Sequence, residues 1–199
     1  GQAELAAELF LTRDPVRAQM LAAELCEQNK RRQNEENQIL TQALARLRME
    51  YNPLEDKIIV LAGEGWHHGV IGIVCSRLCD RYGCPVVLIA LDEDGTGKGS
   101  GRSVKGFNLF EALTSCGDLL QRYGGHELAA GLTVDAAHIE ALRERLRAYA
   151  ENHVSMADLI PQLPIDCMIE PEWITLENIQ ALSVLEPYGM QNEEPVFCI

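Results

Sequence analysis

A short run of glycine, serine and arginine is the first feature of the sequence that could do chemistry. Lys98-Gly99-Ser100-Gly101-Arg102-Ser103 alternates small residues with hydrogen-bond donors. Glycine in a strand often marks the close approach of a ligand, serine hydroxyls donate to phosphate, and arginine offers a planar fork of donors. Alternation along a strand places Ser100 and Arg102 on one face. The run predicts contacts to a phosphodiester, and an exposed polar edge strand is the alternative.

A second run, Gly124-Gly125-His126, could bind the same chemical group. We expect a helix over 108–123 that ends at the double glycine, so that backbone N–H groups point into a cleft and bind an anion. His126 can donate a hydrogen bond to a phosphate or stack on a base. The alternative is an ordinary glycine helix end followed by a surface histidine.

A third candidate is the loop Trp66-His67-His68, which precedes a predicted helix over 70–82. Helix N-termini attract anions, so His67 could help to position a substrate. A metal site made of both histidines and Glu64 is an alternative, but adjacent histidines on one loop rarely ligate one ion. The sequence has no HExxH, P-loop or GxSxG motif and no Asp/His cluster suited to a divalent metal. We therefore expect no metal site and no hydrolysis by this chain alone.

The distribution of charge along the chain shows whether a nucleic acid or a membrane is a plausible partner. The chain has 199 residues and a net charge of −13, which at first argues against nucleic acid. All 17 basic residues, however, lie at or before Arg147, and the nine acids after it carry most of the net charge. Basic residues outnumber acids between 98 and 126, which leaves a mildly basic region for a phosphate backbone. No apolar run approaches the roughly 20 residues of a membrane span, so we expect no membrane partner.

The elements that must position these runs begin with a long helix. Asp14-Pro15 is a helix start, and helix-compatible sequence continues to about Tyr51, before Asn52-Pro53. Its middle, 27–38, has no apolar residue, and a helix that is polar all round typically bridges two domains. We expect a connecting helix over 1–52 that joins a further domain, and a flexible charged linker is the alternative.

The rest of the chain predicts an α/β fold. Apolar strands over 57–62 and 86–91 flank the helix over 70–82, which is a βαβ unit with parallel pairing. A turn, a return strand over 98–104, a strand over 129–134 and a helix over 135–153 complete a mixed β-sheet flanked by helices. We expect one domain over 53–155 and the lead into another over 156–199. Most of the seven cysteines lie in apolar runs without a CxxC pair, which predicts buried, reduced thiols.

Four runs, in this order along the chain, resemble the RecJ single-strand-specific exonuclease family. The resemblance spans nearly the whole chain, and together the runs are highly specific. They are Gly65-Trp66-His67-His68-Gly69-Val70-Ile71-Gly72-Ile73-Val74-Cys75-Ser76-Arg77-Leu78, the run 98–103, Tyr123-Gly124-Gly125-His126-Glu127-Leu128-Ala129-Ala130-Gly131, and the stretch 185–197.

The resemblance implies a domain order and roles for single residues. In this family a DHH phosphoesterase domain holds Mn²⁺ or Mg²⁺, a long helix leads to a DHH-associated domain that binds the strand, and an OB-type domain follows. The implied domains here are the connecting helix (1–52), the DHH-associated nucleic-acid-binding domain (53–155) and the start of a truncated OB-type domain (156–199). The family's metal motifs match nothing in this chain, and the family commonly has proline where His68 stands. The implied nucleic-acid-binding residues are Ser100, Arg102, Ser103, Gly124, Gly125 and His126, followed by His67, Arg31 and Arg32, of which one arginine corresponds to a connecting-helix arginine.

The resemblance also implies a function. This chain would be the substrate-binding part of a cytoplasmic, metal-dependent 5′→3′ exodeoxyribonuclease of DNA repair and recombination, with single-stranded DNA and repair proteins as partners. The missing DHH domain would bind Mn²⁺ or Mg²⁺ and hydrolyse the phosphodiester. Two alternatives stay open: a DHH-family phosphoesterase acting on short oligonucleotides or cyclic dinucleotides, and a non-enzymatic binding module whose acidic tail is the contact surface.

Overall fold

The computed structural model describes residues 3–52, 55–155, 159 and 163–199. It divides into two compact units, Gly1–Ile160 and Pro161–Ile199. Among the described helices, none is both long and apolar enough to cross a membrane. The predicted boundaries at 52 and 155 are not tested by this division and stay predictions.

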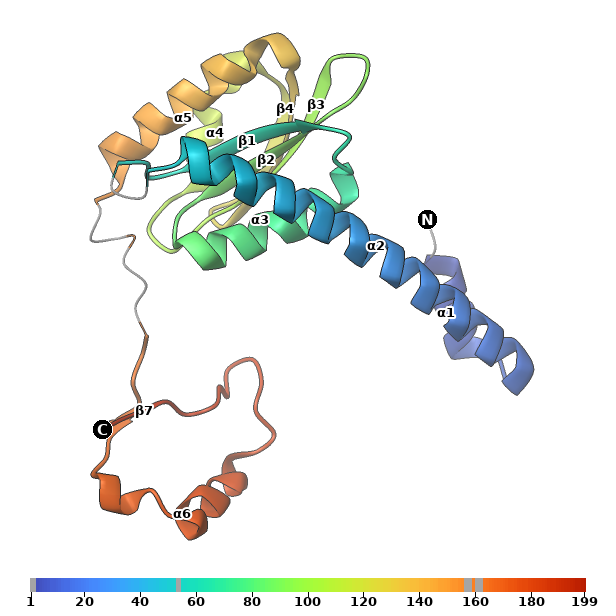
Figure 1. Ribbon diagram of the computed structural model, residues 1–199, viewed down its shortest axis with the longest axis vertical. Helices are drawn as coiled ribbons and strands as arrows, with labels where there is room; N and C mark the ends of the chain where they lie inside the picture. The colour runs from blue at the N-terminus through green and yellow to red at the C-terminus, as the bar shows by residue number, and fades with distance from the viewer. Residues whose placement is uncertain (1–2, 53–54, 156–158, 160–162) are drawn as a thin grey trace. The chain divides into compact units, whose positions relative to one another are not determined.

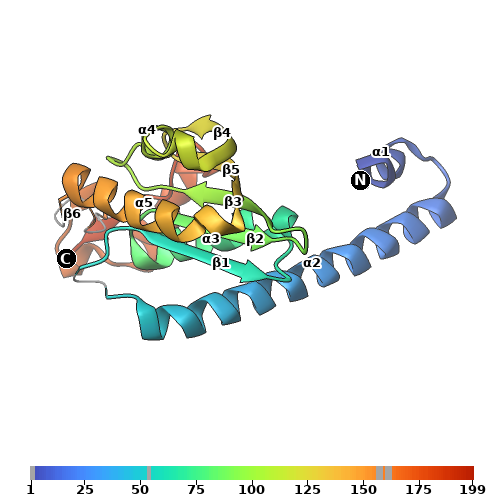
Figure 2. The same ribbon diagram turned by 90° about the horizontal axis from the view of Figure 1, so that it is seen from above.

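A long helix dominates the N-terminal part of the first unit. Helix α2 (Pro15–Glu50) starts where the Asp14 carboxylate accepts a hydrogen bond from the backbone N–H of Val16, and Pro15 occupies its first turn. The predicted helix is therefore confirmed, and the flexible linker is not. A helix that the sequence did not indicate, α1 (Ala3–Leu11), packs against α2, and its Glu8 pairs with Arg17 of α2 at 2.6 Å. Figures 1 and 2 show α1 at the end of α2 that is remote from the sheet.

The predicted βαβ unit is confirmed within a five-stranded sheet. Strands β1 (Ile59–Glu64) and β2 (Val86–Leu91) pair in parallel, and helix α3 (His68–Tyr82) connects them. Gly83 ends α3 in the left-handed conformation with φ 64°. Strands β3 (Thr96–Arg102), β4 (Leu120–His126) and β5 (Ala129–Asp135) are antiparallel, in the sheet order β1-β2-β3-β5-β4.

Each face of the sheet has its own apolar core, because successive strand residues point to opposite faces. On one face, α2 and α3 cover β1 and β2. On the other, helices α4 (Leu109–Thr114) and α5 (Ile139–His153) cover β2, β3 and β5. Figure 2 shows the sheet between these two layers of helices. Leu88, Val86 and Ala90 belong to the α2–α3 core, whereas Val87 and Ile89 belong to the α4–α5 core.

The helix expected over 108–123 is wrong in its second half. Helix α4 ends at Thr114, a 3₁₀ turn follows at Gly117–Leu119, and Leu120–His126 forms strand β4. The helical spacing of leucines in this stretch is a local signal, and the tertiary pairing of β4 with β5 overrides it. Gly124 and Gly125 therefore lie within a strand, and the expected N–H groups at a helix end are not there.

The second unit, described over residues 163–199, has two short paired strands and short helices. Strands β6 (Cys167–Met168) and β7 (Phe197–Cys198) pair in parallel. Helix α6 (Leu176–Ala181) begins at Thr175, whose hydroxyl accepts from the backbone N–H of Asn178, as the sequence predicts. A 3₁₀ turn at Leu182–Leu185 follows.

The cysteines divide into a buried and an exposed set. Burial raises the pKa of Cys75 to about 12 and those of Cys79 and Cys84 to about 11, and it also raises the pKa of Cys116. Cys26 and Cys167 are exposed, which the sequence did not predict.

This division predicts a pattern of alkylation. A thiolate is the reactive form, and a raised pKa leaves almost none of it at pH 8. We expect iodoacetamide at pH 8 to label Cys26 and Cys167 in the native chain and to leave Cys75 and Cys84 unlabelled until denaturant is added, as read by peptide mass spectrometry. Rapid native labelling of Cys75 would contradict the packing of α3 on the sheet.

Candidate nucleic-acid interface

The register of β3, β5 and β4 aligns the candidate residues in rows across the sheet. Residues directly opposite each other in antiparallel strands point to the same face, so each row shares one face. Ser100 pairs with Leu88 of the α2–α3 core, which identifies the face as the one that carries those helices. The rows are Lys98–Thr133–Arg122, Ser100–Gly131–Gly124 and Arg102–Ala129–His126.

The helices cover only part of this face. Helix α3 packs against β2 and β3, whereas Gly131, Gly124 and His126 are exposed. We call the nine residues of the three rows the shelf. Acids are absent from the shelf, and its four charged or ionisable members are Lys98, Arg102, Arg122 and His126. An uncovered sheet face with this composition suits an extended anionic chain.

Arg102 and Ser100 are held together where the shelf meets α3. The Arg102 Nη1 donates to Ser100 Oγ at 3.2 Å and to the carbonyl of Gly101 at 2.8 Å. Gly72 of α3 makes room for them: a Cβ there would stand 3.1 Å from Ser100 Oγ and 3.3 Å from Arg102 Nη2. Arg102 Nε and Nη2 have no hydrogen bond to any described residue, so they remain free to donate to a phosphate.

His126 presents one ring nitrogen outward at the end of β4. Its Nδ1 accepts a hydrogen bond from the backbone N–H of Leu128 at 3.3 Å. In the neutral ring this places the proton on Nε2, because a nitrogen that accepts carries no hydrogen. The exposed Nε2–H can then donate to an anion.

The two glycines of the Gly124-Gly125 pair differ in what a side chain would meet at each position. Gly125 has φ 147°, and a Cβ there would lie 2.3 Å from the carbonyl oxygen of Ala129, so the hairpin itself requires glycine. Gly124 has open space where a Cβ would point, and Gly131 opposite it meets only the Gly99 carbonyl, at 3.8 Å. The described part of the fold does not require glycine at Gly124 or Gly131, so both positions leave room for close approach of another molecule.

Ser103 and His67 serve local structure. The Ser103 hydroxyl donates to the carbonyl of Phe107 at 2.8 Å and closes the turn after β3, so it is not on the shelf. His67 is the N-cap of α3, and its Nδ1 accepts from the backbone N–H of Gly69 at 3.1 Å. Its ring stacks on His68 with centroids 5.1 Å apart.

The candidate arginines of α2 do not lie on the shelf. Arg31 is exposed, with Nε 3.3 Å from a Glu27 carboxylate oxygen one turn earlier. Arg32 donates to the Asn29 side chain at 2.8 Å and approaches Glu36 at 3.5 Å. Of the two, Arg32 is the one that the structure holds in a network.

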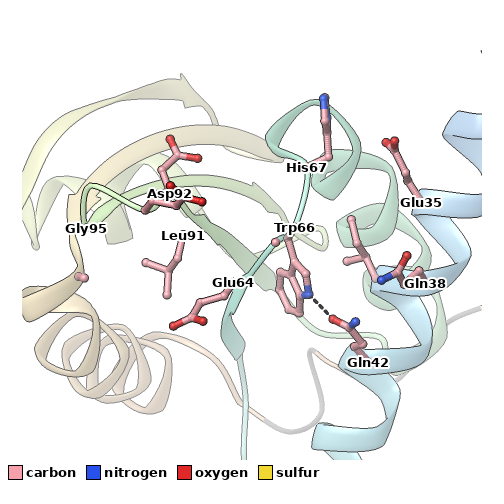
Figure 3. Close-up of a pocket in the computed structure, with 13 residues that line it drawn as sticks. Glu35, Gln38, Gln42, Glu64, Trp66, His67, Leu91, Asp92 and Gly95 are labelled. Atoms are coloured by element: carbon pink, nitrogen blue, oxygen red, sulfur yellow. Dashed lines mark hydrogen bonds between the residues drawn. The ribbon is translucent and has the colours of Figure 1, made fainter.

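A hollow of about 870 Å³ lies at the carboxyl ends of β1 and β2, beside α2 (Figure 3). Trp66 forms part of its wall, with Nε1 donating to Gln42 at 2.7 Å. The hollow has four acids and no Lys or Arg in its lining, so its charge disfavours a phosphate there. The acids are Glu35, Glu64, Asp92 and Glu93.

A resident metal does not fit the described residues. They contain no group of three or more His, Cys, Asp or Glu side chains that could hold an ion. The alternative site of His67, His68 and Glu64 therefore has no support from the geometry, since the two histidines stack on each other.

The sequence analysis placed Ala129 and Gly131 in a family run and counted Arg122 in the basic region, but it did not name them as binding residues, and it did not single out Thr133. The run Gly124–Gly131 forms the turn of a hairpin between β4 and β5, and recognising that hairpin would have placed these residues on one face. The helical spacing of the residues before Gly124 indicated a helix there in place of the first strand of the hairpin.

Family models identify both units of the chain. Residues 55–152 match the DHHA1 domain, so the sheet that carries the shelf is a domain of this class, and residues 165–199 match the RecJ OB domain. The chain belongs to the RecJ family, as the order of its sequence runs predicts.

Its relatives show the same family over nearly the full chain. The single-stranded-DNA-specific exonuclease RecJ of Bacillus subtilis is 40% identical over 195 residues, which is 98% of this chain and 25% of that protein. The crystal structure of RecJ in complex with Mg²⁺ from Thermus thermophilus is 40% identical, with a TM-score of 0.84 over 99% of this chain and 30% of that one. The Mn²⁺ complex from the same organism is 39% identical, with a TM-score of 0.83 over 99% of this chain and 28% of that one. This chain thus spans about a quarter to a third of the length of these relatives.

Proposed function

We propose that this chain is the strand-gripping part of a 5′→3′ exonuclease specific for single-stranded DNA, and that the shelf is its DNA-binding surface. The observation that carries the proposal is the row Ser100–Gly131–Gly124, where two strand glycines have open space that the fold does not use. The RecJ family relation supports the substrate class.

The chemistry of the shelf supports binding of the DNA sugar–phosphate backbone and not recognition of particular bases. The glycine row lets a sugar–phosphate chain approach the sheet, with Arg102 and His126 on one side of it and Lys98 and Arg122 on the other. Arginine forks and an imidazole N–H bind phosphate oxygens without distinguishing bases. The preference for a single strand is part of this proposal, and the names of the relatives as single-stranded-DNA-specific exonucleases support it.

The catalytic step belongs, in this proposal, to a DHH phosphoesterase domain outside this chain. Relatives in the family have been crystallised with Mg²⁺ or Mn²⁺, and the described residues here do not fit such an ion. The connecting segment 1–52, which contains α2, would join the domains 53–155 and 156–199 to that domain. The whole enzyme would act in the cytoplasm with DNA-repair proteins. The match to the RecJ OB domain favours an enzyme for long strands over one for dinucleotides.

A bulky residue on the glycine row tests the proposal. Gly131→Val adds a β-branched side chain where the nearest described atom is 3.8 Å from a Cβ, so the strand should tolerate it. We expect the variant to keep the unfolding midpoint of the wild type and to bind fluorescently labelled oligo(dT) at least about tenfold more weakly at low salt. Thr133→Val, on the same strand and face, is the matched control and should bind within about twofold.

Two results would reject the proposal. One is an absence of salt-sensitive binding at low ionic strength by the wild type, both as this chain and with the preceding domain restored. The other is wild-type affinity in the Gly131→Val variant. Hydrolysis of DNA by the 199-residue chain alone would overturn the separation of binding from catalysis.

A further inference from the structure

Glu36 is the one buried charged side chain among the described residues, and it lies in the polar middle of α2. Its Oε1 accepts from Arg77 Nη1 of α3 at 2.8 Å, and its Oε2 lies 3.5 Å from Arg32 Nη1, one turn earlier in α2. A buried carboxylate is costly unless it is paired, and these two guanidinium groups supply the partners of Glu36.

The same network fixes both arginines at one small hollow. Arg32 Nε and Nη2 donate to Asn29 Oδ1, at 3.3 and 2.8 Å, and Arg77 Nη1 also reaches Asn37 Oδ1 at 3.5 Å. The two arginines and Glu36 line a polar hollow of about 250 Å³. Arg77 Nε and Nη2 have no hydrogen bond to the described residues, so they remain available as donors. Together, the two arginines and Glu36 carry a net positive charge.

Helix α3 connects this pair to the shelf. Gly72 faces Ser100 and Arg102, and Arg77 is five residues further on, about 140° around the helix. One flank of α3 therefore borders the shelf, and the opposite flank carries the arginine that meets α2.

We propose that Glu36 is a positioning residue that holds Arg32 and Arg77 as a pair for a second phosphate of the bound strand. The inference rests on the proposed function, since it assumes that the chain binds a nucleic-acid strand. It assigns a binding role to Arg77 and explains why an acid sits among the cations of the connecting helix: a single carboxylate orients two flexible guanidinium groups.

The direction in which one substitution changes DNA affinity distinguishes positioning of the arginines from a simple effect of charge. Glu36→Gln removes a negative charge beside a polyanion, and by long-range electrostatics alone it should tighten binding. If Glu36 positions the two arginines, the same change weakens binding, because both guanidinium groups lose their shared anchor. The neighbouring Glu35 is exposed and has no ion pair to the described residues, so Glu35→Gln is the matched control for charge.

The experiment measures oligo(dT) binding at several salt concentrations by fluorescence anisotropy, with the 199-residue chain and with the preceding domain restored. We expect Glu36→Gln to weaken binding about fivefold and Glu35→Gln to leave it unchanged or tighter. In a background of Arg32→Ala and Arg77→Ala, Glu36→Gln should no longer weaken binding. Binding that tightens in the single Glu36→Gln variant, or weakens equally in both backgrounds, would overturn the proposal.

Arginine NMR gives a readout that does not depend on DNA. In the wild type we expect separate, protected Nη–H signals for Arg32 and Arg77, because Nη1 of each guanidinium faces the Glu36 carboxylate. In Glu36→Gln we expect both signals to shift and exchange faster while the unfolding midpoint stays within a few degrees. Unchanged arginine signals in that variant would reject positioning whatever the DNA result. Shifted signals in a chain that binds no strand would reject the proposed function and the phosphate role, and would leave Glu36 as the anchor of the two arginines.

Discussion

Gly125→Ala is expected to lower the free energy of unfolding by about 3 kcal/mol or more, whereas Gly124→Ala should change it by less than about 0.5 kcal/mol. At Gly125 the backbone has φ 147°, and an added Cβ would stand 2.3 Å from the Ala129 carbonyl and 2.6 Å from the Ala130 Cα. These are backbone atoms of the paired strand, which cannot move without opening the hairpin. At Gly124 nothing lies within 4 Å of a Cβ.

Urea unfolding followed by circular dichroism measures both changes, and the slope of the transition shows whether the unfolded state is altered. The two variants add the same methyl group to neighbouring residues of one strand, so each controls for the other. At temperatures where both variants are folded, the effect on DNA binding should be the reverse: Gly124→Ala should weaken it more than Gly125→Ala does. Equal stability of the two variants would show that the Gly125 backbone does not adopt its described conformation.

Arg102→Ala is expected to cause the largest loss of affinity for single-stranded DNA, of about tenfold to a hundredfold, without a matching loss of stability. A hydrogen bond to a charged group is worth about 1.5–3 kcal/mol, and Arg102 has Nε and Nη2 available for a phosphate. Losing one phosphate contact should also reduce the slope of log K against log salt by about 0.7. Its Nη1 bonds to Ser100 and Gly101 are only part-buried, so the fold should persist.

Two further variants make the Arg102 result specific. Arg102→Lys keeps the charge but not the fork, so we expect most of the salt slope to return with only part of the affinity. Arg13→Ala removes one positive charge between α1 and α2, at the end of α2 that is remote from the sheet, and should leave affinity within about twofold. If Arg13→Ala and Arg102→Ala weaken binding equally, the effect is one of net charge, and Arg102 is not a contact.

The βαβ unit and the long helix could be predicted from local signals. Val86–Leu91 is a continuous apolar run of strand length, Gly83 stops the helix before it, and Asp14 and Pro15 mark the start of α2. In each case the residues that decide the element lie within the element or next to it, so no distant contact is needed to recognise it.

Strand β4 could not be predicted in the same way. Its leucines also fit a helix, and its partner β5 is what makes it a strand. The two neighbouring glycines were equivalent in the sequence, but pairing directs Gly124 toward the shelf and Gly125 toward the α4–α5 core. The burial of Glu36 was also hidden, since its stretch of α2 reads as solvent-facing and only α3 brings Arg77 against it.

The order of motifs along the chain was thus sufficient to identify the family and the fold class, and to name Ser100, Arg102 and His126 as candidate binding residues. The tertiary structure decided which of the candidates share a face, because a sheet row joins residues from three strands and its register is set by pairing over long sequence separations. Side chains that lie together on the shelf are as far apart in the sequence as Lys98 and Thr133. No local pattern specifies such a neighbourhood, since hydrogen bonds between strands and packing of two helix layers create it.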